Sequence, residues 1–389
     1  MQHRTFGKID WRPSAIGFGI MRLPVHNNDP KQIDEEQSMA MVHKAIDLGV
    51  NYLDTAYGYH GGQSEGFVAK CLVNGYRERV KVATKMPMWL VKEQADLDRY
   101  FEEQRERLQM ERVDFYLLHS LDRERWQTTK ELKVLEWAEK RRAEGHFDYF
   151  GFSFHADLDC FKEIIDGYDG WDMCQIQYNY MDTEYQAGTA GLRYAAERDV
   201  GVVVMEPLRG GMLANDPPPA VATIWQEARA AGVDRSPADW ALQWLWDQPE
   251  VAMLLSGMSN MNHVLENVAS AARSVAGTLT EADFAVIARV KREYERLAPV
   301  GCTACEYCLP CPSGVNIPRF FEEYNNANMY PGYIERARRF YARAEDKDKA
   351  SACTACGECV PKCPQGLDIP ELLAQVHRVF GEGESLPPR

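Results

Sequence analysis

The chain has 389 residues, of which 45% are hydrophobic, and a formal net charge of −14. This length and apolar content indicate one large globular domain with a smaller companion. The acidic balance, without a stripe of lysine or arginine, argues against a nucleic-acid-binding surface, and no apolar run is long enough to span a bilayer. The N-terminal residues lack the apolar stretch of a signal peptide, which predicts a cytoplasmic location.

Short β-branched or aromatic runs alternate with amphipathic stretches of helical length between residues 14 and 272. Eight strands separated by helices over this length predict a (β/α)8 barrel of the α/β class. A doubly wound open sheet is the alternative, but the sequence lacks the glycine-rich first turn of that fold. The predicted strands are Ala15–Gly19, Val50–Asp54, Val80–Thr84, Val113–Leu118, Tyr149–Phe152, Met173–Gln177, Val200–Met205 and Val251–Leu255.

Four polar residues follow or end three consecutive predicted strands: Asp54 and Tyr59, then Lys85, then His119. The carboxyl ends of barrel strands meet at one face, so these side chains are expected to converge there. A lysine cation lowers the pKa of a nearby tyrosine, an aspartate holds the lysine, and a histidine orients a carbonyl group. Such a set can protonate a carbonyl oxygen while hydride reaches the carbon.

The sequence after the barrel predicts a connecting helix and a second domain. Residues 278–281 read Thr-Leu-Thr-Glu, a capping box that begins an amphipathic stretch. We therefore predict a barrel over residues 1–275, a linker helix over 276–298 and a small, mainly helical domain over 299–389.

The second domain contains an internal repeat of cysteines. Its first three cysteines recur 51 residues later, and the fourth recurs 52 residues later together with its following proline. The second group matches the bacterial ferredoxin spacing C-x2-C-x2-C-x3-C-P, whereas the first group has one residue fewer before its last cysteine. Two [4Fe-4S] clusters are predicted, with zinc as the alternative. The predicted ligands are Cys302, Cys305, Cys308, Cys311, Cys353, Cys356, Cys359 and Cys363.

In two-cluster ferredoxins the fourth cysteine of each group serves the other cluster. The shortened spacing leaves open which cluster Cys311 and Cys363 each ligate. The remaining cysteines, Cys71, Cys160 and Cys174, are scattered and are predicted to be buried core residues.

The barrel region resembles the aldo-keto reductase family over roughly residues 10–272. The resemblance includes the segments IGFGIMRLP, QIQYN and MEPLRGGML, and Asp54, Tyr59, Lys85 and His119 match the family's tetrad in order and spacing. With the cysteine domain, the whole chain resembles the ferredoxin-containing branch of that family. The resemblance implies an oxidoreductase that reduces a carbonyl or oxidises an alcohol with NAD(P)H.

The same resemblance implies a nicotinamide dinucleotide extended across the barrel mouth. Ser153 and Gln177 would hold the carboxamide, Leu208 and Gly210 would contact the pyrophosphate, and Glu266 and Asn267 would reach the adenine. The basic residues that usually bind the 2′-phosphate are replaced by Gly257 and His263, so the choice between NADP and NAD stays open.

A nicotinamide transfers two electrons as hydride, whereas a cluster transfers one. Three hypotheses therefore describe how the barrel and the cysteine domain are related. In the first, the barrel is a carbonyl reductase and the clusters are structural or sensory. In the second, the clusters carry electrons from a protein partner to a barrel-bound flavin or substrate. In the third, the chain is a non-catalytic redox sensor or electron-transfer subunit. The substrate and the oligomeric state cannot be inferred from the sequence.

Overall fold

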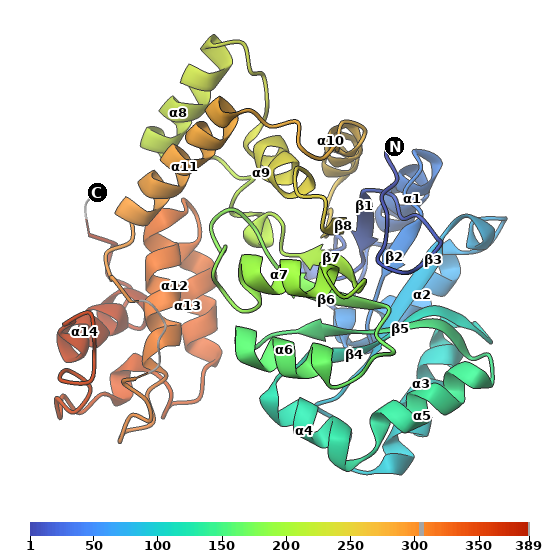
Figure 1. Ribbon diagram of the computed structural model, residues 1–389. Coiled ribbons are helices and arrows are strands. Elements are labelled where there is room, and N and C mark those ends of the chain that lie inside the picture. Colours follow the sequence, from blue (N-terminus) through green and yellow to red (C-terminus); the bar gives the residue numbers. More distant parts are fainter. Residues whose placement is uncertain (303–306, 388–389) are drawn as a thin grey trace. The chain divides into compact units, whose positions relative to one another are not determined.

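The computed structural model describes residues 1–302 and 307–387. These residues separate into two compact units (Figure 1). The first unit comprises residues 1–213 and 235–280, and the second comprises residues 214–234 and 281–389. Each unit is described below by itself.

The first unit is a closed barrel, which confirms the predicted fold. Within the described residues, eight parallel strands pair in chain order, and β1 closes the barrel against β8. The strands are β1 (Ile16–Gly19), β2 (Tyr52–Asp54), β3 (Lys81–Met86), β4 (Val113–Leu121), β5 (Phe147–Phe154), β6 (Met173–Gln177), β7 (Gly201–Met205) and β8 (Val251–Ser256).

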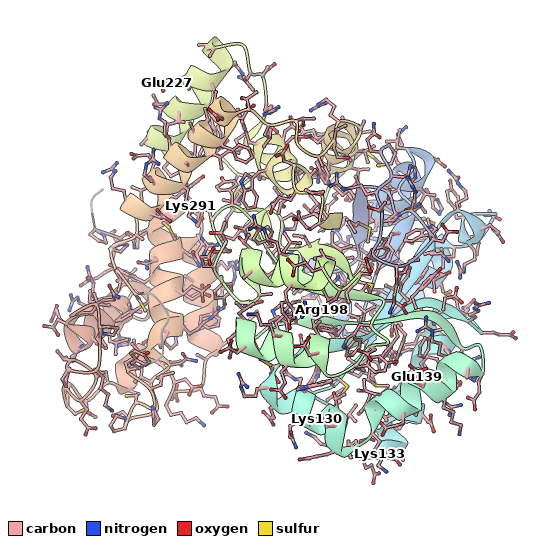
Figure 2. All side chains as sticks on the ribbon, viewed as in Figure 1. Lys130, Lys133, Glu139, Arg198, Glu227 and Lys291 are labelled. Atoms are coloured by element: carbon pink, nitrogen blue, oxygen red, sulfur yellow. The ribbon has the colours of Figure 1, made fainter. Side chains whose placement is uncertain are left out.

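Helices of this unit lie around the barrel and bury their apolar faces against its strands (Figure 1). They are α1 (Glu35–Asp47), α2 (Ser64–Cys71), α3 (Gln94–Leu108), α4 (Arg123–Glu131), α5 (Val134–Ala143), α6 (Leu158–Asp166), α7 (Gly188–Ala196), α9 (Pro237–Trp246) and α10 (Met261–Ala271). Charged residues such as Lys130 on α4 and Arg198 just after α7 (Figure 2) pair with Glu163 and Asp166 on α6.

The interior of the barrel changes from apolar to polar along its strands. Tyr52, Phe115 and Met173 belong to one buried cluster inside the barrel. Side chains two residues apart on a strand share a face, so Asp54 and Gln175 follow Tyr52 and Met173 into the interior. The apolar layer closes the amino-terminal part of the barrel and leaves the polar groups at the carboxyl ends, where barrel active sites lie.

The second unit is helical. Its helices are α8 (Pro219–Ala230), α11 (Glu281–Arg296), α12 (Ile317–Met329), α13 (Ile334–Arg343) and α14 (Ile369–Phe380). Helices α8 and α11 pack together, and Arg289 pairs with Glu227 at 2.7 Å (Figure 2 labels Glu227). By contacts, therefore, segment 214–234 groups with the predicted linker helix; the sequence-based domain boundaries remain a prediction.

The internal repeat is visible in the backbone. Helices α12 and α14 each begin with Ile-Pro shortly after a cysteine group, and they pack against each other through Tyr324 and Phe380. Asp368 caps α14 by accepting the N–H of Glu371, whereas Asn316 occupies the same position on α12 without a side-chain cap bond. Among the helices of the described ranges, none combines the length and apolar composition needed to cross a bilayer.

Candidate functional site

A buried lysine lies at the centre of the polar layer. Lys85 on β3 is fully buried, and its Nζ donates to Asp54 Oδ1 and to the carbonyl oxygen of Thr55, both at 2.7 Å. The same Nζ lies 3.5 Å from the hydroxyl oxygen of Tyr59. Gln175 on β6 donates to the other oxygen of Asp54 at 3.2 Å. The ammonium group is thus held by strand β2 on one side and faces the tyrosine hydroxyl on the other.

The loop that carries Tyr59 is anchored by its neighbour in sequence. Tyr59 begins a short 3-10 helix, η2 (Tyr59–Gly62), in which His60 adopts a left-handed φ of 52°. The backbone N–H of Leu23 donates to Nε2 of His60 at 3.3 Å, so Nε2 is unprotonated and Nδ1–H donates to the carbonyl of Pro30 at 2.8 Å. These bonds tie the loop after β2 to the loop after β1 and fix the position of Tyr59.

His119 is turned into the site by an irregularity in strand β4. The pairing of β4 with β5 shifts between Leu118 and Leu121, and Ser120 has a φ of 56°. Bulges of this kind redirect side chains beside active sites. The His119 ring lies edge-on to Tyr59 and to Trp89, with centroids 5.7 and 5.0 Å away. Within the described residues, the buried Nδ1 of His119 has no hydrogen-bond partner.

The charges of these groups follow from burial and proximity. Burial alone would lower the pKa of Lys85, but Asp54 and Tyr59 raise it above its ordinary value, so the amine is a cation. Burial raises the pKa of Tyr59, and Lys85 offsets only part of that rise. Burial, reinforced by the charge of Lys85, holds the pKa of His119 well below its ordinary value. At neutral pH the site therefore contains a neutral imidazole, a neutral phenol and an ammonium.

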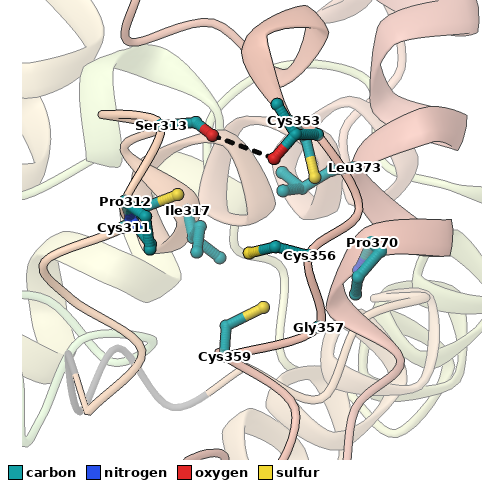
Figure 3. A pocket seen from close by; sticks show the side chains of 11 residues that line it. Cys311, Pro312, Ser313, Ile317, Cys353, Cys356, Gly357, Cys359, Pro370 and Leu373 are labelled. Atoms are coloured by element: carbon teal, nitrogen blue, oxygen red, sulfur yellow. Dashed lines mark hydrogen bonds between the residues drawn. The ribbon is translucent and has the colours of Figure 1, made fainter.

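A second constellation lies in the helical unit, where four cysteines line one cavity (Figure 3). Cys353, Cys356 and Cys359 come from the second repeat, and Cys311 comes from the first. Burial raises the pKa of Cys359, and the charges of the other three raise it further, as expected where thiolates gather. Four soft sulfur ligands around one space suit a [4Fe-4S] cluster. The residues therefore fit the group that the spacing predicted.

The other predicted cluster ligands in the described part of the chain do not line this cavity. Cys302 and Cys363 are partly exposed, and Cys308 is buried. Cys305 lies outside the described residues. Across the described ranges, no three histidine, cysteine or carboxylate side chains meet closely enough to bind a single metal ion. The predicted core cysteines, Cys71, Cys160 and Cys174, are each fully buried in the barrel unit.

Comparison with known proteins identifies the barrel. The model of the aldo/keto reductase family matches residues 15–291, which is more than half of the chain. The chain belongs to the aldo/keto reductase family. Residues 301–368 match the model of a 4Fe-4S dicluster domain. This reductase therefore combines the family's barrel with an iron–sulfur domain, as the sequence indicated.

The reductase is similar to characterised members of the family along most of their length. It is 28% identical to L-galactose dehydrogenase of Arabidopsis thaliana, covering 69% of this chain and 87% of the relative. It is 26% identical to the NADH-specific methylglyoxal reductase of Escherichia coli, covering 76% of this chain and 100% of the relative. A Klebsiella pneumoniae aldo-keto reductase solved in complex with NADPH superimposes with a TM-score of 0.59 at 25% identity, covering 75% and 96% of the two chains.

The residues that the family resemblance assigned to the nucleotide lie at the ends of strands β5 and β6 or after strands β7 and β8. Ser153 is buried at the end of β5, and its Oγ accepts the N–H of Ser120 at 2.7 Å. Gln177 ends β6 and donates to Asp182 at 3.4 Å. In the loop after β7, Leu208 precedes the 3-10 helix η4 (Arg209–Gly211).

That helix contains Gly210 with a φ of 66°. On α10, which follows β8, Glu266 is exposed, while Asn267 is buried and donates to Ser256 at 3.0 Å. These residues and the tetrad thus all lie at the carboxyl ends of barrel strands or in the segments that follow them.

Arg22 packs against Gly257, the position at which the family usually has a basic residue. A β-carbon at Gly257 would lie 3.1 Å from Cβ, Cγ and Cδ of Arg22, so the Arg22 side chain would have to shift to accept a larger residue there. Arg22 also pairs with Glu206 at 3.0 Å. The side chain packed against Gly257 therefore comes from the loop after β1, which is distant in sequence, and this contact was not predicted.

Sequence reasoning also missed the groups that support the buried lysine. Behind strand β3, Glu65 accepts hydrogen bonds from Thr84 at 2.6 Å and from Gln104 at 2.7 Å. Gln104 also donates to the carbonyl of Lys85 at 3.0 Å. Thr84 alternates with Lys85 on the strand and therefore points outward, so a polar residue at that position was the available signal.

The buried ion pair can be tested by its stability. Asp54→Asn leaves the Lys85 cation buried without its counter-charge, and we expect the barrel to lose ~3–5 kcal/mol of unfolding free energy. The double variant Asp54→Asn/Lys85→Met removes both charges and should recover much of that loss. Urea denaturation followed by tryptophan fluorescence measures both.

The matched control is the exposed pair between Lys70 and Glu35. Glu35→Gln should change the unfolding free energy by about 1 kcal/mol or less. An Asp54→Asn variant as stable as wild type, or a double variant no more stable than the single one, would contradict the assignment of a charged pair.

Proposed function

We propose that the barrel catalyses NAD(P)H-dependent reduction of a carbonyl compound, and the reverse oxidation of an alcohol, at Asp54, Tyr59, Lys85 and His119. The observation that carries the proposal is the fully buried Lys85 cation between Asp54 and the Tyr59 hydroxyl. The unpartnered Nδ1 of His119, among the described residues, adds a second polar group beside that hydroxyl. Tyr59 is partly exposed, and the substrate carbonyl is proposed to bind beside its hydroxyl.

The proposed chemistry assigns one step to each side chain. The reduced nicotinamide, when bound, supplies the hydride that adds to the carbonyl carbon. Tyr59 donates its proton to the carbonyl oxygen, which becomes the hydroxyl of the product. Lys85 stabilises the tyrosinate left behind, and Asp54 keeps Lys85 charged and in place. Neutral His119 orients the carbonyl by donating an N–H hydrogen bond.

The nucleotide is proposed to lie across the carboxyl ends of β5 to β8. Ser153 Oγ accepts a backbone N–H, which leaves its own proton to donate to the carboxamide. Gln177, Leu208, Gly210, Glu266 and Asn267 are the further proposed contacts. Arg22 beside Gly257 is a candidate for the adenosine phosphate, which supports NADP. The NADH-specific relative keeps NAD as the second hypothesis.

Two [4Fe-4S] clusters are proposed for the helical unit, where they supply one-electron transfer. Cys353, Cys356, Cys359 and Cys311 would hold one cluster, because these four line a single cavity. By the internal repeat, Cys302, Cys305, Cys308 and Cys363 would hold the other. A protein electron donor or acceptor is the proposed partner for the clusters, and a small carbonyl or alcohol is the proposed partner for the barrel.

The proton donor is tested by Tyr59→Phe. We expect this variant to bind NADPH with unchanged affinity but to lose at least ~100-fold in turnover of a panel of aldehydes that includes methylglyoxal, because general acid catalysis contributes that much. Steady-state kinetics and equilibrium NADPH binding are the measurements.

Tyr57→Phe is the matched control, since the Tyr57 hydroxyl donates to Glu103 outside the tetrad. A Tyr59→Phe enzyme with wild-type turnover would remove Tyr59 as the acid.

The pH dependence of the wild-type enzyme is a second test of Tyr59. The reduction rate should stay level through neutral pH and fall only above about pH 10, because burial raises the pKa of Tyr59 above its ordinary value.

Iron content and electron paramagnetic resonance (EPR) test whether Cys311 of the first repeat ligates the cluster of the second repeat. Cys311→Ser and Cys356→Ala should each reduce the iron content from about eight to about four per chain, and both should leave the same cluster spectrum. Cys363→Ser should remove the other cluster and leave a different spectrum. The control Cys71→Ala, which is buried in the barrel, should retain all of the iron.

A Cys311→Ser spectrum that matches Cys363→Ser would show that Cys311 serves the cluster of its own repeat. Full iron content in Cys356→Ala would remove that residue as a ligand.

A further inference from the structure

A pair of hydroxyl groups lies at the edge of the cysteine cavity. Ser313 and Thr354 both line this cavity, and their hydroxyl oxygens are 3.2 Å apart (dashed line in Figure 3). Ser313 lies two residues after Cys311, and Thr354 directly follows Cys353. The hydrogen bond therefore links the two repeats beside the position at which each contributes a proposed ligand.

One hydroxyl proton of the Ser313–Thr354 pair is not needed for the hydrogen bond between them. Two hydroxyl groups carry two protons, and the bond between their oxygens takes one of them. Whichever residue donates in that bond, the other keeps a proton that is available to an acceptor in the cavity. Apolar residues form much of the remaining lining: Pro312, Ile317, Pro370 and Leu373. Thr354 is exposed and Ser313 is partly exposed, so the remaining proton can reach water or, once the cavity is filled, a sulfur atom inside it.

The second cavity expected from the repeat does not have the same pair. The residue that corresponds to Ser313 is Gln365, 52 positions later, and Thr354 corresponds to Thr303, 51 positions earlier, outside the described residues. A glutamine carries an amide on a longer side chain, so it does not reproduce a short serine hydroxyl. The repeat is therefore chemically asymmetric beside its fourth cysteines.

We propose that the Ser313–Thr354 pair donates a hydrogen bond to a sulfur of the cluster held with Cys311 and so raises the reduction potential of this cluster above that of the other. The proposal rests on the two clusters of the proposed function. One-electron reduction adds negative charge to the cluster, and a donor stabilises the reduced form more than the oxidised form. The two clusters would then fill with electrons in a defined order, the Cys311 cluster first.

The test is an anaerobic EPR-monitored redox titration of the cluster-replete full chain, with dithionite as the reductant. Wild type should show two midpoint potentials. The double variant Ser313→Ala/Thr354→Val removes both protons, and it should lower the higher potential while leaving the other unchanged. Ser313→Thr keeps a hydroxyl and should retain the wild-type value. Gln365→Ala, the matched change in the other repeat, should leave the higher potential unchanged.

The outcomes separate this inference from the proposed function. Iron analysis comes first, and a wild-type protein without about eight irons per chain would overturn the two-cluster proposal itself. With both clusters present, unchanged potentials in the double variant would overturn the hydrogen-bond proposal. Equal shifts of both potentials would also overturn it. The shifted signal must be the one missing from Cys311→Ser, and a shift of the other signal would contradict the assignment.

Discussion

The barrel site depends on keeping a positive charge inside a protein interior. Burying an ammonium group is costly unless a counter-charge and further acceptors surround it. Asp54 and the Thr55 carbonyl meet this requirement for Lys85, and Gln175 holds the second oxygen of Asp54. These three groups come from β2, from the residue that follows it and from β6. The closed barrel is therefore the device that makes a charged lysine possible beside Tyr59.

In the helical unit, the groups that must be brought together are cysteine thiolates, which carry like charges. The four cysteines around one cavity would repel one another as thiolates, and this repulsion adds to the effect of burial, which is the main cause of the raised pKa of Cys359. A cluster relieves this repulsion by binding the thiolates to iron. Because Cys311 comes from the first repeat and the other three from the second, bound metal would also fasten the repeats together. Folding of this unit and cluster binding are therefore expected to be coupled.

Much of the barrel could be predicted because its signals are local. Each predicted strand overlaps an observed one, since β-branched runs and intervening amphipathic stretches report burial directly. The tetrad residues could be predicted to lie at one face, because each of them is at or near the carboxyl end of a predicted strand and these ends meet at one face of a barrel. The bulge at Ser120 and the contact between Gln175 and Asp54 could not be predicted, because both depend on pairing between strands distant in sequence. The partners of Cys311 were likewise hidden, since spacing alone does not show which repeat a fourth cysteine faces.

The proposed hydride site in the barrel and the proposed one-electron clusters are expected to work independently unless a mediator is present. The most direct test is an anaerobic titration of cluster-replete protein with NADPH, and then with NADH, followed by the visible iron–sulfur absorption. We expect no bleaching by either nucleotide, full bleaching by dithionite, and nucleotide oxidation only after an aldehyde is added. Bleaching by NADPH without a mediator would contradict this expectation, because the hydride would then be divided into single electrons within the protein.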